Sequence, residues 1–122
     1  MTEAAPISLD RIEKYLQSAI NAQDKLTTEF LETVREFETA ETEFNIRFAQ
    51  ERFTARTNAD IDGVKMTEKL ADDIATNKTK DERRSMAAAR ARIDATRQSL
   101  NSVRKKMDAY QTLSANHRVA GG

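Results

Sequence analysis

The stretch Thr57-Asn58-Ala59-Asp60-Ile61-Asp62-Gly63 interrupts a chain that otherwise has the pattern of two long helices. Asn, Asp and Gly are residues that turns prefer, and the 122 residues contain only three glycines and one proline. Two helix-like segments of similar length, residues 9–59 and 65–117, flank the stretch. The sequence therefore predicts an all-α fold in which one domain, residues 1–122, forms a long antiparallel helical hairpin (a coiled coil) about the turn.

The predicted elements are a helix at about residues 8–60, a turn at about 58–66 and a helix at about 66–117. On the first helix a stripe of mostly apolar residues recurs at steps of three and four, which places the stripe on one helical face. A helix of this length is stable only when such a stripe is buried along its whole run. The stripe consists of Leu9, Ile12, Leu16, Ile20, Gln23, Leu26, Phe30, Val34, Phe37, Phe44 and Phe48.

The second helix starts near Met66, with Thr67 as its expected cap. Residues 76–85 hold nothing apolar, and residues 79–82 (TKDE) have the form of a capping box. Two interpretations follow: one continuous helix, or a helix that breaks near residues 76–80 and starts again. The absence of Gly and Pro favours the continuous helix. Beyond this stretch the apolar rhythm is regular, through Met86, Ala89, Ile93, Thr96, Leu100, Val103, Met107 and Tyr110.

Between residues 44 and 53 the first helix is apolar on two sides, because some of its apolar residues fall off the stripe. In the predicted hairpin this belt faces residues 73–82, the least apolar part of the second half. Leaving large apolar side chains in water would cost about 1.5–3 kcal/mol each. We therefore expect a second copy of the chain to cover the belt, giving a homo-oligomer (a dimer or larger helical bundle), with a foreign protein as the alternative. The predicted contact residues are Phe44, Ile46, Phe48, Ala49 and Phe53.

The net charge is zero, but residues 1–62 hold 13 acidic and 7 basic residues and residues 63–122 hold the reverse. Two antiparallel helices of opposite charge attract each other, and a basic half could also bind a phosphate backbone. No aromatic residue lies among the basic residues from 78 to 106, so a stacking platform for single strands is missing. Nucleic-acid binding is therefore the second hypothesis, after protein–protein binding. Its candidate residues are Lys78, Lys80, Arg83, Arg84, Arg90 and Arg97.

Two residue types that catalysis and metal binding often use, cysteine and histidine, are absent or scarce, and the numerous carboxylates occupy helical surface positions beside Lys and Arg. The chain has no cysteine, and His117 is its single histidine, which removes thiolate chemistry and histidine-based triads. Residues 58–63 (NADIDG) resemble the first half of a calcium-binding loop, but Lys69 stands where that loop needs a glutamate. We expect a protein that is not an enzyme, with no catalytic residues, no metal and no cofactor. No apolar run approaches the ~20 residues of a membrane span, so we expect no membrane contact and a cytoplasmic location.

The second half has a recognisable sequence pattern in residues 63–71 (GVKMTEKLA), 90–95 (RARIDA) and 110–118 (YQTLSANHR). It resembles small helical, coiled-coil accessory proteins encoded by bacteriophages and prophages. The resemblance implies a phage-encoded accessory protein of DNA recombination or replication, present in a bacterial host, with another phage or host protein as a partner. It identifies no functional residue. The size is also similar to that of the small helical hairpins of the type VII secretion pathway, but their turn carries a tryptophan that this chain lacks.

Overall fold

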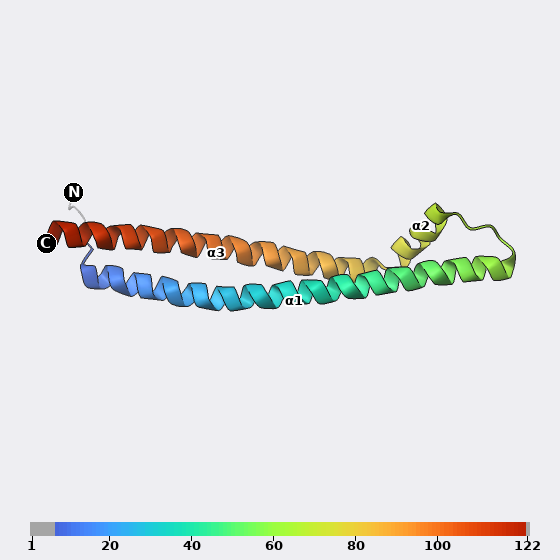
Figure 1. Ribbon diagram of the computed structural model, residues 1–122, viewed down its shortest axis with the longest axis horizontal. Helices are drawn as coiled ribbons and strands as arrows, with labels where there is room; N and C mark the ends of the chain where they lie inside the picture. Colours follow the sequence, from blue (N-terminus) through green and yellow to red (C-terminus); the bar gives the residue numbers. More distant parts are fainter. Residues whose placement is uncertain (1–6, 122) are drawn as a thin grey trace, which may run out of the picture. The chain divides into compact units, whose positions relative to one another are not determined.

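The computed structural model describes residues 7–121, so the two ends of the predicted domain, residues 1–6 and 122, lie outside the described part. The described residues form α-helices and no strand, which confirms the all-α class (Figure 1). The helices are α1 (Leu9–Asp62), α2 (Glu68–Lys78) and α3 (Lys80–Gly121). Two compact units are present: unit 1 combines residues 7–31 with 94–121, and unit 2 comprises residues 32–93.

The helix α1 begins and ends at residues suited to those positions. Ser8 caps its start, because its side-chain oxygen accepts a hydrogen bond from the Arg11 amide at 3.3 Å. Its end is set by Gly63, whose φ of +69° is a left-handed conformation that glycine adopts without strain. The Val64 amide then donates to the Ala59 carbonyl oxygen at 2.8 Å, which closes the last turn. Residues 57–62 therefore belong to α1, and the chain turns over residues 63–67.

In unit 1, the first part of α1 packs antiparallel to the last part of α3. The rings of Tyr15 and Tyr110 stack with 5.7 Å between their centroids. Nearer the two helix ends, Arg118 lies 3.7 Å from a carboxylate oxygen of Glu13. The buried and half-buried residues of both helices recur mostly at steps of three and four, as in a coiled coil. The buried residues of this unit are Ile12, Ala19, Leu100 and Ser114.

In unit 2, small side chains bring the helices close together. Ala71 and Ala75 of α2 are 0% exposed, and Ala55 and Ala59 near the end of α1 are 8% and 5% exposed. Ion pairs connect α2 to the same part of α1, because Glu68 of α2 pairs with Arg52. The start of α3 runs antiparallel to residues 32–48 of α1, and Ala89 is its buried residue there.

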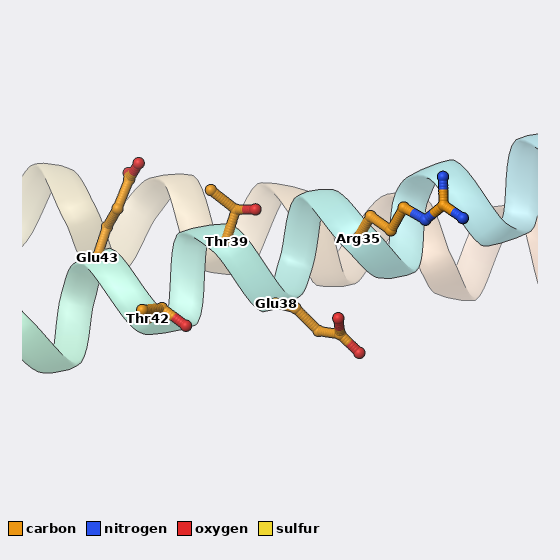
Figure 2. A pocket seen from close by; sticks show the side chains of 5 residues that line it. All are labelled: Arg35, Glu38, Thr39, Thr42 and Glu43. Atoms are coloured by element: carbon orange, nitrogen blue, oxygen red, sulfur yellow. The ribbon is translucent and has the colours of Figure 1, made fainter.

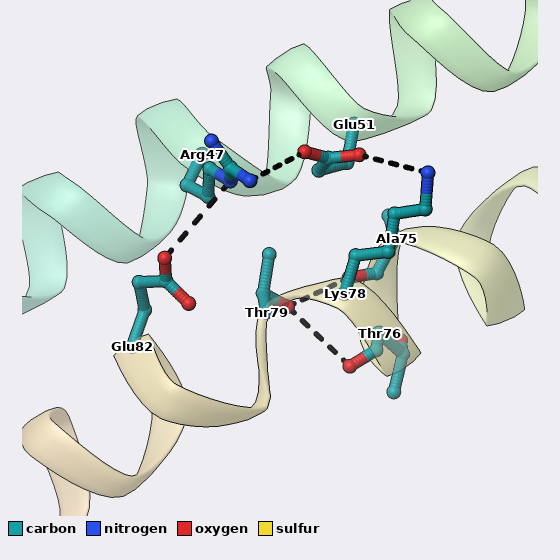
Figure 3. Close-up of polar contacts among 7 residues, drawn as sticks. All are labelled: Arg47, Glu51, Ala75, Thr76, Lys78, Thr79 and Glu82. Carbon is teal, nitrogen blue, oxygen red and sulfur yellow. Dashed lines mark hydrogen bonds and ion pairs between the residues drawn. The ribbon is translucent and has the colours of Figure 1, made fainter.

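The continuous second helix that the sequence favours is not what the structure has. The helix α2 ends at Lys78, and α3 begins one residue past the fully buried Thr79. The Thr79 hydroxyl donates to the Ala75 carbonyl oxygen at 2.7 Å, so it completes the end of α2 (Figure 3). The backbone of Thr79 has φ −110° and ψ 26°, which departs from helical values and lets α2 incline to α3 (Figure 1). The break occurs at a buried polar residue, without Gly or Pro.

Candidate functional site

The five belt residues lie on two opposite faces of α1. Phe44 and Phe48 are half-buried, their ring centroids are 5.7 Å apart, and the Arg83 guanidinium lies over the Phe44 ring. Ile46 is 54% exposed and Phe53 is 73% exposed, and Ala49 is exposed as well. Half a helical turn separates Phe44 from Ile46 and Phe48 from Ile46. Two phenylalanines of the belt therefore belong to the interior of unit 2, and the other three residues remain at the surface.

The exposed belt residues form part of a longer band that we call the outer stripe. Its members recur at helical spacing on the face of α1 opposite Phe44 and Phe48. They are Thr39, Thr42, Ile46, Ala49, Gln50, Phe53 and Thr57. All are exposed, and none is charged, although 33% of the residues in the chain are charged. A solvated helix face normally carries charged side chains, so an uncharged band with two large apolar residues indicates a surface suited to contact.

The outer stripe has a hollow at one end. The hollow is shallow and largely open to solvent, with a volume of about 460 Å³, and all of its lining residues belong to α1: Arg35, Glu38, Thr39, Thr42 and Glu43. Figure 2 shows the two short threonines between the longer side chains of Arg35, Glu38 and Glu43. Four of these residues have the spacing i, i+3, i+4 and i+7, which is the set that forms a hole for a side chain of a facing helix in a coiled coil.

Three of the candidate nucleic-acid-binding arginines lie over phenylalanine rings of α1. Arg83 is 5.7 Å from the centre of the Phe44 ring, and Arg90 is 5.6 Å from that of Phe37; both pairs are in unit 2. In unit 1, Arg97 lies 5.9 Å from the centre of the Phe30 ring. The three arginines are seven residues apart, as are the three phenylalanines. This repeat is a cation–π series worth about 0.5–1 kcal/mol for each exposed pair.

Of the other three basic candidates, two form ion pairs and one is exposed to solvent. Lys78 lies 3.7 Å from Glu51 of α1, Arg84 lies 4.0 Å from Asp81 of its own helix, and Lys80 is exposed. Including the three arginines over rings, four of the six candidates contact α1. These contacts favour an internal role for most of the basic residues over a face reserved for phosphate.

A set of ion pairs between α1 and α2 was not predicted from the sequence. Arg52 pairs with Glu68 and lies 2.7 Å from Asp72, and Arg56 also pairs with Glu68. The charge pattern contains a signal for this set, because three arginines, Arg47, Arg52 and Arg56, lie near the end of the acidic first half and α2 opens with Glu68. A comparison of the net charges of the two halves of the chain does not reveal this local reversal, in which basic residues of the first half face acidic residues of the second.

Next to this set, Glu51 of α1 connects α1 with α2 in unit 2. One of its carboxylate oxygens lies 2.9 Å from Arg47, and the other faces Lys78 of α2 (Figure 3). Arg47 also lies 3.9 Å from Glu82 of α3. Glu82 therefore faces α1, although the sequence placed it in a capping box with Thr79.

The described residues contain no group of three or more His, Asp or Glu side chains placed to hold a metal ion. Asn58, Asp60 and Asp62, which resemble part of a calcium loop, lie within the last turns of α1, so their side chains are spread around a helix. Within residues 7–121, no helix combines the length and apolar character needed to cross a membrane.

Comparison of the chain with protein-family models, curated proteins and solved structures gives no match.

Proposed function

We propose that this protein is a non-enzymatic helical interaction or scaffold protein, a helical hairpin that assembles into a homo-oligomeric bundle and acts by binding other proteins. Its resemblance to phage accessory proteins supports a phage-encoded role in the cytoplasm of a bacterial host, with further phage or host proteins as partners. The observation that carries the proposal is the outer stripe, on which Ile46 and Phe53 are 54% and 73% exposed.

Burial of these two side chains provides a driving force for association. Fully burying an exposed large apolar side chain contributes about 1.5–3 kcal/mol. Ile46 and Phe53 are already partly covered, so each contributes a part of this figure, once in each of the two copies. The threonines and the alanine of the stripe are short, so a partner helix can approach α1 closely there. A band of this kind on an otherwise highly charged surface is characteristic of protein–protein contact.

A nucleic-acid-binding accessory of phage recombination or replication is the second candidate. The observation that favours it is the exposure of basic side chains on α3: the side chain of Arg84 is 80% exposed and that of Arg97 is 61% exposed. An arginine over an aromatic ring keeps its charge and its N–H donors, so these groups could still contact phosphates. Binding of this type would weaken steeply as the salt concentration rises.

The molar mass in solution distinguishes the two candidates. Light scattering after size exclusion should give a multiple of the 13.8 kDa chain mass, unchanged when a short DNA duplex is added at low salt. A mass of one chain without DNA that rises with DNA would support the nucleic-acid candidate instead. If the mass is that of one chain under both conditions, self-association is excluded. Charge reversal at Arg84, which pairs only weakly within α3, provides the control for any DNA effect.

A further inference from the structure

The hollow and Phe53 lie at equal distances from Ile46 along the outer stripe. Thr39, in the hollow, precedes Ile46 by seven residues, and Phe53 follows it by seven residues. Seven residues of α-helix correspond to two turns, or about 10 Å. A face with a large apolar side chain on one side of a central residue and a hollow on the other is complementary to itself when one copy is rotated by 180°.

We propose that the outer stripe binds the outer stripe of a second copy in antiparallel orientation about a two-fold axis at Ile46. Each Phe53 then enters the hollow at Thr39 and Thr42 of the other copy, and the two Ile46 side chains meet at the axis. The arrangement is that of knobs and holes in an antiparallel coiled coil. This inference rests on the proposed function, and it specifies the partner, the orientation and the register.

The charges beside the stripe favour the antiparallel orientation. Residues 36–43, before Ile46, carry four glutamates and no basic residue. Residues 47–56, after it, carry three arginines and one glutamate. An antiparallel pair places the acidic segment of each copy beside the basic segment of the other, whereas a parallel pair places like charges together.

The side chains on both sides are accessible for this contact. Those of Arg47 and Arg56 are 50% and 43% exposed despite their internal ion pairs, and that of Glu36 is 50% exposed beside Arg92. The same residues can therefore keep their contacts within unit 2 and add attraction between copies.

The absence of cysteine from the chain allows a direct test by disulfide crosslinking. In the proposed register, Ile46→Cys places two cysteines at the axis, so this variant should form a covalent dimer by itself under mild oxidation. Thr42→Cys and Gln50→Cys each place identical cysteines about 12 Å apart along the helix axes. That separation exceeds the ~7 Å between Cα atoms that a disulfide spans. Neither variant should link to itself, but an equal mixture of the two should give the mixed dimer.

Ser102→Cys is the control, because Ser102 is an exposed residue of α3 outside the stripe and its crosslinking measures random collision. Circular dichroism of every variant confirms that the helices are retained. Self-linking of Thr42→Cys and Gln50→Cys would show a parallel pair and overturn the orientation.

The outcome also separates this inference from the proposed function. If the unmodified chain has an oligomeric mass but Ile46→Cys links no more than Ser102→Cys, the outer stripe is not the interface, while self-association stands. If the unmodified chain has the mass of one copy, self-association fails and this inference fails with it.

Discussion

Thr79 is the buried residue that lies at the junction between α2 and α3. It is 0% exposed, and its hydroxyl and its backbone amide both donate to the Ala75 carbonyl oxygen, at 2.7 and 3.1 Å. A buried hydroxyl with its bond made stabilises this one geometry, and a hydroxyl without a partner would destabilise it. Two signals of the junction are visible in the sequence, an apolar gap and a capping-box pattern, but neither reveals that the side chain would be buried.

Replacing the hydroxyl of Thr79 by a methyl group tests its role. We expect Thr79→Val to lower the free energy of unfolding by about 1 kcal/mol, because the substitution keeps the shape and removes one buried hydrogen bond. Thr112→Val is the matched control, since Thr112 makes the same bond to Asp108 at 2.9 Å on an exposed face of α3. Urea unfolding at one fixed protein concentration measures both variants. Equal losses would show that burial of Thr79 contributes nothing.

Gly63 ends α1 with a positive φ of +69°, and a Cβ atom added there would meet nothing within 4 Å. The cost of a side chain is therefore backbone strain alone. Gly63→Ala should lower the free energy of unfolding by about 1 kcal/mol, because alanine disfavours the left-handed region. Gly63→Asn should cost less, since asparagine tolerates that region. An alanine variant as stable as the unmodified chain would mean that the turn adopts another conformation.

Among the secondary-structure elements, α3 follows the sequence most closely. Its predicted rhythm from Met86 to Tyr110 coincides with the buried and half-buried residues of the helix. Next to these apolar positions, arginines recur every seven residues, at positions 83, 90 and 97. Each of them packs over a phenylalanine of α1. The guanidinium groups cover part of the rings of Phe30, Phe37 and Phe44. These rings therefore need fewer apolar neighbours than the sequence pattern suggests.

The coupling between Arg90 and Phe37 should be measurable by a double-mutant cycle. With Arg90→Gln and Phe37→Leu, we expect an interaction free energy of about 0.5–1 kcal/mol in urea unfolding. Arg104→Gln combined with Phe37→Leu is the control, because Arg104 is two heptads further along α3 and the corresponding residue of α1 there is Gln23. That control pair should be additive within about 0.3–0.5 kcal/mol. Additive losses for Arg90 and Phe37 would exclude a specific cation–π contact.

The sequence predicted the long helix α1 and its terminating glycine, because both depend on local periodicity and turn chemistry. It favoured a continuous second helix over the alternative of a break near residues 76–80, because the position of α2 depends on contacts distant in sequence, such as those of Arg52 with Glu68 and Asp72. The candidate site was predicted in part. The two-sided apolar pattern of residues 44–53 is visible in the sequence, but the hollow at Thr39 and Thr42 depends on how the side chains of Arg35, Glu38 and Glu43 extend.

For the molecule as a whole, the proposed assembly requires two kinds of surface on α1. One face packs within the chain, through residues such as Phe37 and Phe44. The opposite face, the outer stripe, is uncharged, and in the proposed assembly it is the face that binds a second copy. A polar substitution on the first face should reduce folding, whereas the same substitution on the outer stripe should reduce assembly and leave the helices intact. Helicity and mass together therefore separate the two effects.

The decisive experiment is to measure the molar mass of the unmodified chain and of Phe53→Asp by light scattering at matched concentrations. We expect twice 13.8 kDa for the unmodified chain and a shift toward 13.8 kDa for Phe53→Asp, with helical circular dichroism retained. Val119→Asp, at an 83% exposed apolar residue of α3, should keep the mass of the unmodified chain. Equal masses for Phe53→Asp and the unmodified chain would contradict the claim that the outer stripe holds two copies together.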